Sequence, residues 1–177
     1  MAIRRRFIGL AIVGILGIGI WVLGSVSQAT AETLKFKSFN HVTKQEEVPV
    51  ADVEGHAISL TVREGVAVFE NGEWAWHKSA YLRNYVKGAG TSESYGTYTF
   101  LDGSSIIVHG KGTIEATPAG VPSSAKWTVE VIHGTGRFQG IKGTTTTTST
   151  KLLPPEKDEP VGKALSEGTL VYTLPSK

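Results

Sequence analysis

The sequence predicts an all-β domain, an antiparallel calycin-like barrel of about eight strands, behind an N-terminal segment that does not belong to the fold. Short runs rich in β-branched and aromatic residues recur along the chain, and Gly, Asn, Asp and Pro separate them. No segment after the N-terminal one has the period of a persuasive amphipathic helix. Closing such a meander into a barrel removes its exposed edges, and a two-sheet sandwich is the alternative.

The first 31 residues have the organisation of a cleavable secretory signal peptide. Residues 4–6 are arginines, residues 7–23 are apolar, and Ala29-Thr30-Ala31 supplies small residues at a cleavage site. Cleavage after Ala31 would leave residues 32–177 as one domain in the periplasm or outside the cell. The sequence also permits a twin-arginine signal, because residues 4–8 resemble that motif, or an uncleaved anchor, because the apolar stretch is just long enough to span a membrane.

Charge and cysteine content exclude several classes of function. The chain has 18 Lys and Arg against 16 Asp and Glu, but three of the arginines lie in the leader. No basic run follows residue 6, so we expect no nucleic-acid partner, and any membrane contact would be through an uncleaved leader. The absence of cysteine excludes disulfides, zinc–thiolate sites and cysteine nucleophiles.

The strands and turns are expected in a simple sequential order. Asn71-Gly72 and Asp102-Gly103 are two-residue hairpin signals, because these residue types tolerate positive φ. A third turn is expected at Glu64-Gly65, and loops at 45–53, 118–124 and 152–161. The expected strands cover about Leu34–Phe39, His56–Arg63, Val66–Glu70, Trp74–Val86, Tyr95–Leu101, Ser105–Thr117, Lys126–Ile132, Phe138–Thr150 and Thr169–Leu174.

Three sets of alternating apolar residues are predicted to point into the barrel. In a sheet with one buried face, the apolar face is the buried one. We therefore expect the interior to be filled or lined by Trp74 and Trp76, by Trp127, Val129 and Val131, and by Leu170, Tyr172 and Leu174. Thr128, Glu130 and Thr173 would then face solvent.

Two segments carry a resemblance to a known group. Residues 96–105 read GTYTFLDGSS and residues 133–143 read HGTGRFQGIKG. They resemble the hairpin and the turn-and-strand motifs of the allene oxide cyclase and dirigent-protein barrel superfamily. His133 and Ile141 depart from the residues common there. The resemblance implies a barrel and carries no activity with it, because the motifs look like scaffold.

The motif residues have structural roles in this interpretation. Gly134 and Gly136 would make a tight turn with positive φ, and Arg137 and Phe138 would point to opposite faces. Gly140 and Gly143 would leave space for a large neighbour such as Trp127. Asp102 and Gly103 are explained as turn residues.

The remaining candidate chemistry is sparse. The five histidines, His41, His56, His77, His109 and His133, stand at no metal-binding spacing, so we expect neither a metal site nor a cofactor. Glu93, Asp102, Glu115 and Arg137 would support acid–base chemistry only if they pointed inward. No nucleophile or phosphate-binding motif is present.

Two functions therefore remain open. The first is a non-catalytic exported barrel that binds a small apolar or aromatic molecule, with Trp74, Trp76, Trp127 and Tyr172 as candidate ligand-binding residues, or that serves as a stable module. The second is an isomerase- or cyclase-type enzyme acting on a hydrophobic substrate inside the barrel. The sequence does not determine the catalytic residues, the ligand or the oligomeric state.

Overall fold

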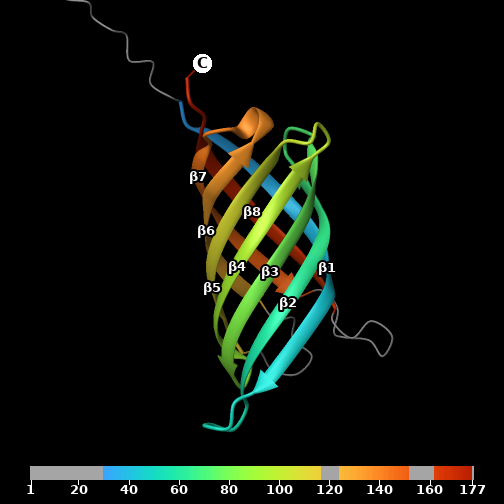
Figure 1. Cartoon of the computed structure of the whole chain (residues 1–177), viewed down its shortest axis with the longest axis vertical. Helices are drawn as coiled ribbons and strands as arrows, with labels where there is room; N and C mark the ends of the chain where they lie inside the picture. The colour runs from blue at the N-terminus through green and yellow to red at the C-terminus, as the bar shows by residue number, and fades with distance from the viewer. Residues whose placement is uncertain (1–29, 117–123, 152–161, 177) are drawn as a thin grey trace, which may run out of the picture.

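The computed structural model describes residues 30–116, 124–151 and 162–176, which form a closed antiparallel β-barrel. Eight strands follow one another around the barrel in chain order, and the last strand pairs with the first (Figure 1). The predicted all-β barrel is therefore confirmed, and the sandwich alternative is wrong. Residues 1–29 of the predicted signal peptide, and residues 118–123 and 152–161 of the expected loops, lie outside the described residues.

The strands are longer than the sequence pattern indicated. Their bounds are β1 (Glu32–Pro49), β2 (His56–Phe69), β3 (Trp74–Val86), β4 (Ala89–Phe100), β5 (Ser105–Ile114), β6 (Ser124–Thr135), β7 (Lys142–Lys151) and β8 (Lys163–Thr173). A short 3₁₀ turn, η1 (Gly136–Phe138), lies between β6 and β7. No helix in the described part of the chain is long and apolar enough to span a membrane.

The barrel has two chemically different ends. At one end lie the turns after β2 and β4, η1, and the start of β1 (Figure 1). We call it the Phe138 end. At the other lie the turns after β1 and β3, which we call the Arg83 end. The strands run between these two ends, so a residue's position along its strand determines which end of the barrel it lies near.

The two predicted hairpin signals both form turns, but with three-residue loops. The N–H of Gly72 donates to the carbonyl of Phe69, and the N–H of Gly103 donates in the same way to the carbonyl of Phe100, each at 3.0 Å. Gly72 and Gly103 have φ of +85° and +81°, whereas neither Asn71 nor Asp102 has positive φ. The glycine of each pair therefore carries the left-handed conformation in a three-residue loop.

The turn expected at Glu64-Gly65 is wrong, because β2 passes through it without a break. Gly65 pairs with Asn40 of β1, and a Cβ built on Gly65 would lie 1.8 Å from the carbonyl oxygen of Phe39. The glycine thus permits close approach of two strands. A glycine within an extended run marks such a contact as readily as it marks a turn.

The interior at the Phe138 end is an aromatic cluster. The Phe69 and Phe100 rings stack at 5.3 Å, Phe100 contacts Phe138 at 4.8 Å, and Phe36 contacts both Phe69 and Tyr98 at 5.7 Å. Contacts of this kind add to the free energy gained by burying the rings. This half of the barrel is filled by its own side chains.

The interior toward the Arg83 end is polar instead. Its buried polar side chains are several short hydroxyl residues, one asparagine and one histidine, namely Ser38, Asn40, Ser59, Thr61, His77, Ser79, Ser92, Ser149 and Ser166. Small side chains leave space that larger apolar ones would fill. The interior is therefore aromatic at the Phe138 end and mixed toward the Arg83 end, where Tyr81 and Trp127 are also buried.

The predicted inward orientation holds for two of the three sets. Trp127, Val129, Val131 and Leu170 are buried, and Tyr172 and Leu174 pack against the core. Trp74 and Trp76 are the exception, because their side chains are 43% and 49% exposed on the outer face.

The reason lies in the neighbours of β3. Ala75, fully buried between the two tryptophans, pairs with Ala67 on one side and with Phe100 on the other. Only a small side chain fits beside the phenylalanine cluster. Lys78 lies on the same face of β3 as Trp76. Because charged side chains are mostly exposed, Lys78 indicated in the sequence that this face of the strand points to solvent.

Candidate functional site

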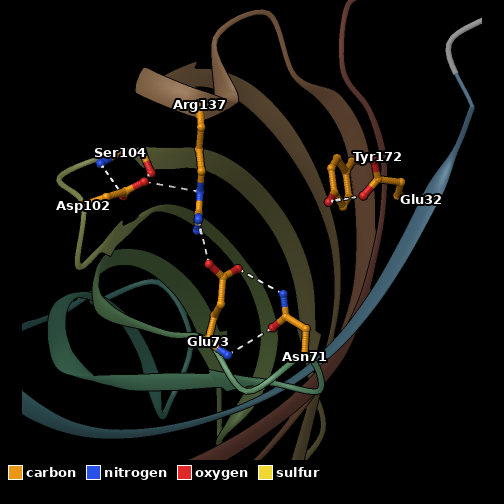
Figure 2. A network of polar contacts seen from close by, with 7 residues as sticks. All are labelled: Glu32, Asn71, Glu73, Asp102, Ser104, Arg137 and Tyr172. Carbon is orange, nitrogen blue, oxygen red and sulfur yellow. Dashed lines mark hydrogen bonds and ion pairs between the residues drawn. The ribbon is translucent and has the colours of Figure 1, made fainter.

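Arg137 links three turns at the Phe138 end of the barrel. Its Nη1 lies 2.6 Å from Oε1 of Glu73 and its Nε lies 3.5 Å from Oδ2 of Asp102 (Figure 2). The guanidinium also lies 4.8 Å from the ring centroids of both Phe100 and Phe138. Arg137 thus covers the aromatic cluster from outside, while Phe138 is buried in it, so the two point to opposite faces as predicted.

The carboxylates of this network are themselves held by their own turns. Oδ1 of Asp102 accepts hydrogen bonds from the backbone N–H and the hydroxyl of Ser104, and these bonds, with a smaller effect of Arg137, lower the pKa of Asp102. Oε2 of Glu73 accepts a hydrogen bond from Nδ2 of Asn71. Every charged group drawn in Figure 2 has a protein partner. Such fully paired charges are typical of residues that stabilise the fold.

The motif glycines differ in what they do. Gly136 has φ of +58°, as predicted, but Gly134 does not have positive φ. A Cβ on Gly134 would lie 2.2 Å from the Phe138 carbonyl oxygen, so this position requires space. Gly140, with φ of +78°, faces Pro175, and Gly143 faces Tyr172. Trp127 therefore does not lie over either of them.

Trp127 lies instead over Gly112 of β5, where a Cβ would come within 2.6 Å of the indole. Its ring meets Tyr81 edge to face at 5.2 Å. Both rings line a hollow in the interior, on the side toward the Arg83 end. Trp127 is the one predicted ligand-binding residue that the structure places beside a hollow inside the barrel.

An inner chamber of about 40 Å³ lies beyond these two rings. Hydroxyl groups surround it from several strands, and two of them, Ser149 and Ser166, hydrogen-bond each other at 2.6 Å. The residues that line it are Ser38, His77, Ser79, Tyr81, Ser94, Gly96, Tyr98, Val108, Trp127, Val129, Thr147, Ser149 and Ser166. The chamber therefore offers hydrogen-bond donors and acceptors next to aromatic faces.

A larger hollow of about 140 Å³ lies at the Arg83 end. Trp127 and Ser149 line both this hollow and the chamber, so these two side chains border both spaces. We call the larger space the outer hollow. Its described lining residues are Val42, Gln45, Arg63, Arg83, Ile114, Ser124, Ala125, Trp127, Ser149, Gly162, Lys163 and Ala164.

Arg63 and Arg83 stand out in this lining. Their guanidinium carbons lie 4.9 Å and 5.5 Å from the centroid of the Tyr81 ring. Burial, and then the nearby charge of Arg63, lower the pKa of Arg83 to about 10. Arg83 therefore stays protonated at neutral pH, and two positive charges lie together inside the barrel.

His77 is the buried titratable group of the chamber. Its Nδ1 lies 2.9 Å from Oδ1 of Asn40, and Nδ2 of Asn40 donates to the hydroxyl of Ser38. Since Oδ1 can only accept, Nδ1 of His77 carries the proton and Nε2 keeps its lone pair. Burial, and then Arg63, lower the pKa of His77 to about 4, so the ring is neutral at neutral pH.

The Tyr98 ring holds the imidazole in place. The two rings are stacked at 4.4 Å with an angle of 5° between their planes. Burial raises the pKa of Tyr98 above its usual range. Within the described residues, Nε2 of His77 makes no hydrogen bond, and a neutral acceptor thus lies among hydroxyl donors.

The other candidate residues from the sequence lie apart from this site. Tyr172 is at the Phe138 end, where its hydroxyl donates to Glu32 at 2.6 Å (Figure 2). His109 pairs with Glu93 at 2.6 Å on the outer face. His133 faces solvent, opposite Ile107 and not His109. Over the described ranges, no group of three or more metal-ligating side chains is found.

The residues that sequence reasoning missed are Arg63, Arg83, His77 and Tyr81. A signal was present in β2, where Arg63 shares a face with Thr61 and Ala67, two of the most deeply buried residues. A charge on such a face is expensive to bury, so its presence indicates a special environment. Which strand would lie beside it was not readable from the sequence.

Fold and site together define a closed eight-stranded antiparallel β-barrel with one packed end and a polar interior hollow. No family model matches the sequence, and no curated protein matches it. Among solved structures, the chain is similar to the pterocarpan synthase dirigent protein PsPTS1, with 16% identity and a TM-score of 0.46 over 85% of this chain and 99% of that one. It is also similar to the pterocarpan synthase dirigent protein GePTS1, with 10% identity and a TM-score of 0.44 over 97% and 99%.

Proposed function

We propose that this protein is an exported barrel that binds a small ring-bearing molecule inside its polar half. The observation that carries the proposal is a pair of interior spaces, the outer hollow and the hydroxyl-lined chamber, which have Trp127 and Ser149 in both linings. Pockets that hold small molecules combine aromatic walls with a few placed polar groups, and Trp127, Tyr81 and the surrounding serines are of these kinds. The ligand expected from the sequence was apolar or aromatic. The polar lining favours an aromatic one that also carries hydrogen-bonding groups.

The packing of the Phe138 end indicates that a ligand would enter the barrel from the Arg83 end. Phe36, Phe69, Phe100 and Phe138 are all buried and contact one another in succession, and Arg137 covers Phe100 and Phe138. A ligand would therefore enter past Arg83 and stop at the aromatic cluster.

Fluorescence of Trp127 tests this proposal directly. Trp74 and Trp76 are exposed and would add a background, so the Trp74→Phe/Trp76→Phe variant leaves Trp127 as the reporter in the mature domain. Titration with aromatic alcohols, aldehydes and acids is expected to change its emission. Native mass spectrometry of protein purified from its source is expected to show a mass above that of the polypeptide.

The matched control is the Trp127→Phe variant, which keeps both exposed tryptophans. It is expected to show no response to the same compounds. A response that persists in Trp127→Phe would place binding on the outer face of the barrel. No response in either variant, together with a native mass equal to that of the bare chain, would refute a ligand in the interior.

A second candidate function, an isomerase-type activity, is favoured by His77. Its Nε2 could take a proton from a carbon of the ligand and return it to another atom of the same molecule, so that the mass is unchanged. Asn40 would keep the imidazole in the required tautomer. The lowered pKa of His77 suits only a carbon acid that loses its proton readily.

Hydrogen exchange in D₂O tests this second function. Phenylacetone, a ring-bearing ketone with acidic C–H groups, is expected to gain deuterium faster with the protein than without it. The His77→Gln variant should lose that acceleration while Trp127 fluorescence still reports binding. Equal exchange with both proteins would assign His77 a purely structural role.

A further inference from the structure

Arg63 of β2 and Arg83 of β3 lie on the inner face of neighbouring strands. Arg83 pairs with Ser59, and Arg63 pairs with Ser79, so their backbones lie four residues apart along the strands, on either side of Tyr81. Their side chains converge, because both guanidinium groups lie against the same Tyr81 ring. Burial, and then the nearby charge of Arg63, lower the pKa of Arg83.

No described carboxylate compensates these charges. The Nε atoms of Arg63 and Arg83 are buried and have no hydrogen-bond partner among the described residues. No Asp or Glu occurs in the described lining of the outer hollow. Arg137, the only other arginine after the leader, is in contrast paired with both Glu73 and Asp102.

Arg63 and Arg83 are partly buried, and a positive charge that loses part of its hydration without gaining an anionic partner is costly. Two such charges around one cavity are explained if the cavity normally receives an anion. The guanidinium group suits a carboxylate best, since its planar fork donates two parallel hydrogen bonds to the two oxygens. Trp127 and Ala125 in the same lining provide an apolar wall for the rest of such a ligand.

We propose that Arg63 and Arg83 bind the carboxylate of a small aromatic acid, whose ring lies against Trp127. This inference rests on the proposed function and names the chemical class of its ligand. The volume of the outer hollow, about 140 Å³, restricts the acid to a compact one with a single ring. The hydroxyl groups of the chamber would receive polar substituents at the far side of that ring.

Pairs of acids and amides test the inference. Benzoate, phenylacetate and cinnamate are each compared with the matching neutral amide by calorimetric titration of the full-length or processed protein. An acid is expected to bind at least 10-fold more tightly than its amide. In Arg63→Gln and Arg83→Gln this preference should disappear, so that the acid and its amide bind with similar affinity.

Arg137→Gln is the matched control, because it removes the same charge from the opposite end of the barrel. It should keep the preference for the acid. A second readout does not need the ligand: without ligand, Arg83→Gln is expected to melt at the same or a higher temperature than the unmodified protein, since it removes an unpaired buried charge. A lower melting temperature would mean that the arginines support the fold and would overturn the inference.

The remaining outcomes separate the two proposals. If acid and amide bind equally in all variants, the ring-bearing ligand stands and the anion is refuted. If sulfate raises the melting temperature as much as the aromatic acids do, the site takes an inorganic anion and the aromatic acid is refuted. If neither acids nor amides bind, and Trp127 fluorescence does not respond to the other compounds, the proposed function fails together with this inference.

Discussion

Thr61 is completely buried on the inner face of β2, and its Oγ1 has no hydrogen-bond partner among the described residues. Thr145 of β7 is its natural comparison, since it is also buried but its Oγ1 donates to the carbonyl of Thr169 at 2.7 Å. An unsatisfied buried hydroxyl lowers stability, whereas a satisfied one raises it. The hydroxyl of Thr61 is therefore expected to lower the stability of the fold, and that of Thr145 to raise it.

Replacing each threonine by valine exposes this difference. Thr61→Val should raise the free energy of unfolding by about 1 kcal/mol, because it removes an unpaired polar group. Thr145→Val should lower it by about 1 kcal/mol, because the carbonyl of Thr169 loses its donor. Urea denaturation of the two variants measures both values. A loss of stability in Thr61→Val as large as that in Thr145→Val would show that Thr61 has a partner.

His56 joins the turn after β1 to the end of β3. Its Nδ1 lies 2.6 Å from Oδ1 of Asp52 and its Nε2 lies 2.9 Å from Oδ1 of Asn84. Both partners are acceptors, so the protonated ring satisfies them best. The hydrogen bond to Asp52, and then that to Asn84, raise the pKa of His56, and the hydrogen bond to His56 lowers the pKa of Asp52.

This pair predicts a pH dependence of stability. A raised pKa in the folded state means that the stabilisation is complete below the unfolded pKa of about 6.5 and is lost as the pH rises through the folded value. For Asp52 the sign is opposite, and its contribution is lost only as the pH falls below 3.8. Melting temperatures between pH 5 and pH 9 should decline more steeply for the unmodified protein than for His56→Gln. Parallel curves would exclude this role for His56.

At the scale of elements, glycines act in two ways that the sequence does not separate. Gly72 has φ of +85° with no atom within 4 Å of an added Cβ, so its requirement is conformational. Gly134 has no positive φ, yet its Cβ would collide with the Phe138 backbone. One glycine forms a turn, and the other allows two segments to touch.

Alanine at each position separates these two requirements. Gly72→Ala should cost about 1 kcal/mol, the price of a left-handed conformation for an L-residue. Gly134→Ala should cost about 3 kcal/mol, because the obstacle is backbone that cannot rotate away. Chemical denaturation of both variants provides the comparison. Equal losses would show that the chain relaxes around Gly134 and that the collision is not decisive.

Several strand boundaries were predictable and others were not. The sequence pattern identified β3 at its true bounds and both three-residue turns at their true places, since alternation and turn glycines are local signals. It ended β1 at Phe39, ten residues before its last paired residue, Pro49. Residues 43–47 are all polar and residues 43–49 are all exposed, so they lack the alternation that marks a half-buried strand. Pairing with β2 holds them, and pairing is a tertiary contact.

At the scale of the whole molecule, closure of the barrel places the first strand against the last. Glu32 pairs with Tyr172 of β8, and the hydroxyl of Tyr172 donates to the Glu32 carboxylate. The first residue of β1 is also the first residue after the predicted cleavage site. Removing residues 1–31 would therefore leave every rung between β1 and β8 in place.

The predicted cleavage after Ala31 is compatible with a strand that begins at Glu32. We expect N-terminal sequencing of the exported protein to begin at Glu32. Ala31→Leu, which removes the small residue from the cleavage position, should accumulate in the membrane fraction as the uncleaved precursor. An exported protein that begins at Met1 or Ala2 would show that the leader is retained as an anchor.

The sequence by itself determined the all-β class, the number and order of the strands to a good approximation, and the turns at Gly72 and Gly103. These features depend on residues close together in the chain, where alternation and backbone freedom act locally. Only the tertiary structure decided which face of β3 is inside, since both faces carry large side chains and the phenylalanines of other strands take the interior space. It also brought Arg63 and Arg83 to the same Tyr81 ring and Asn40 beside His77. Such pairs depend on strand register around a closed barrel, and register follows from the packing of all eight strands at once.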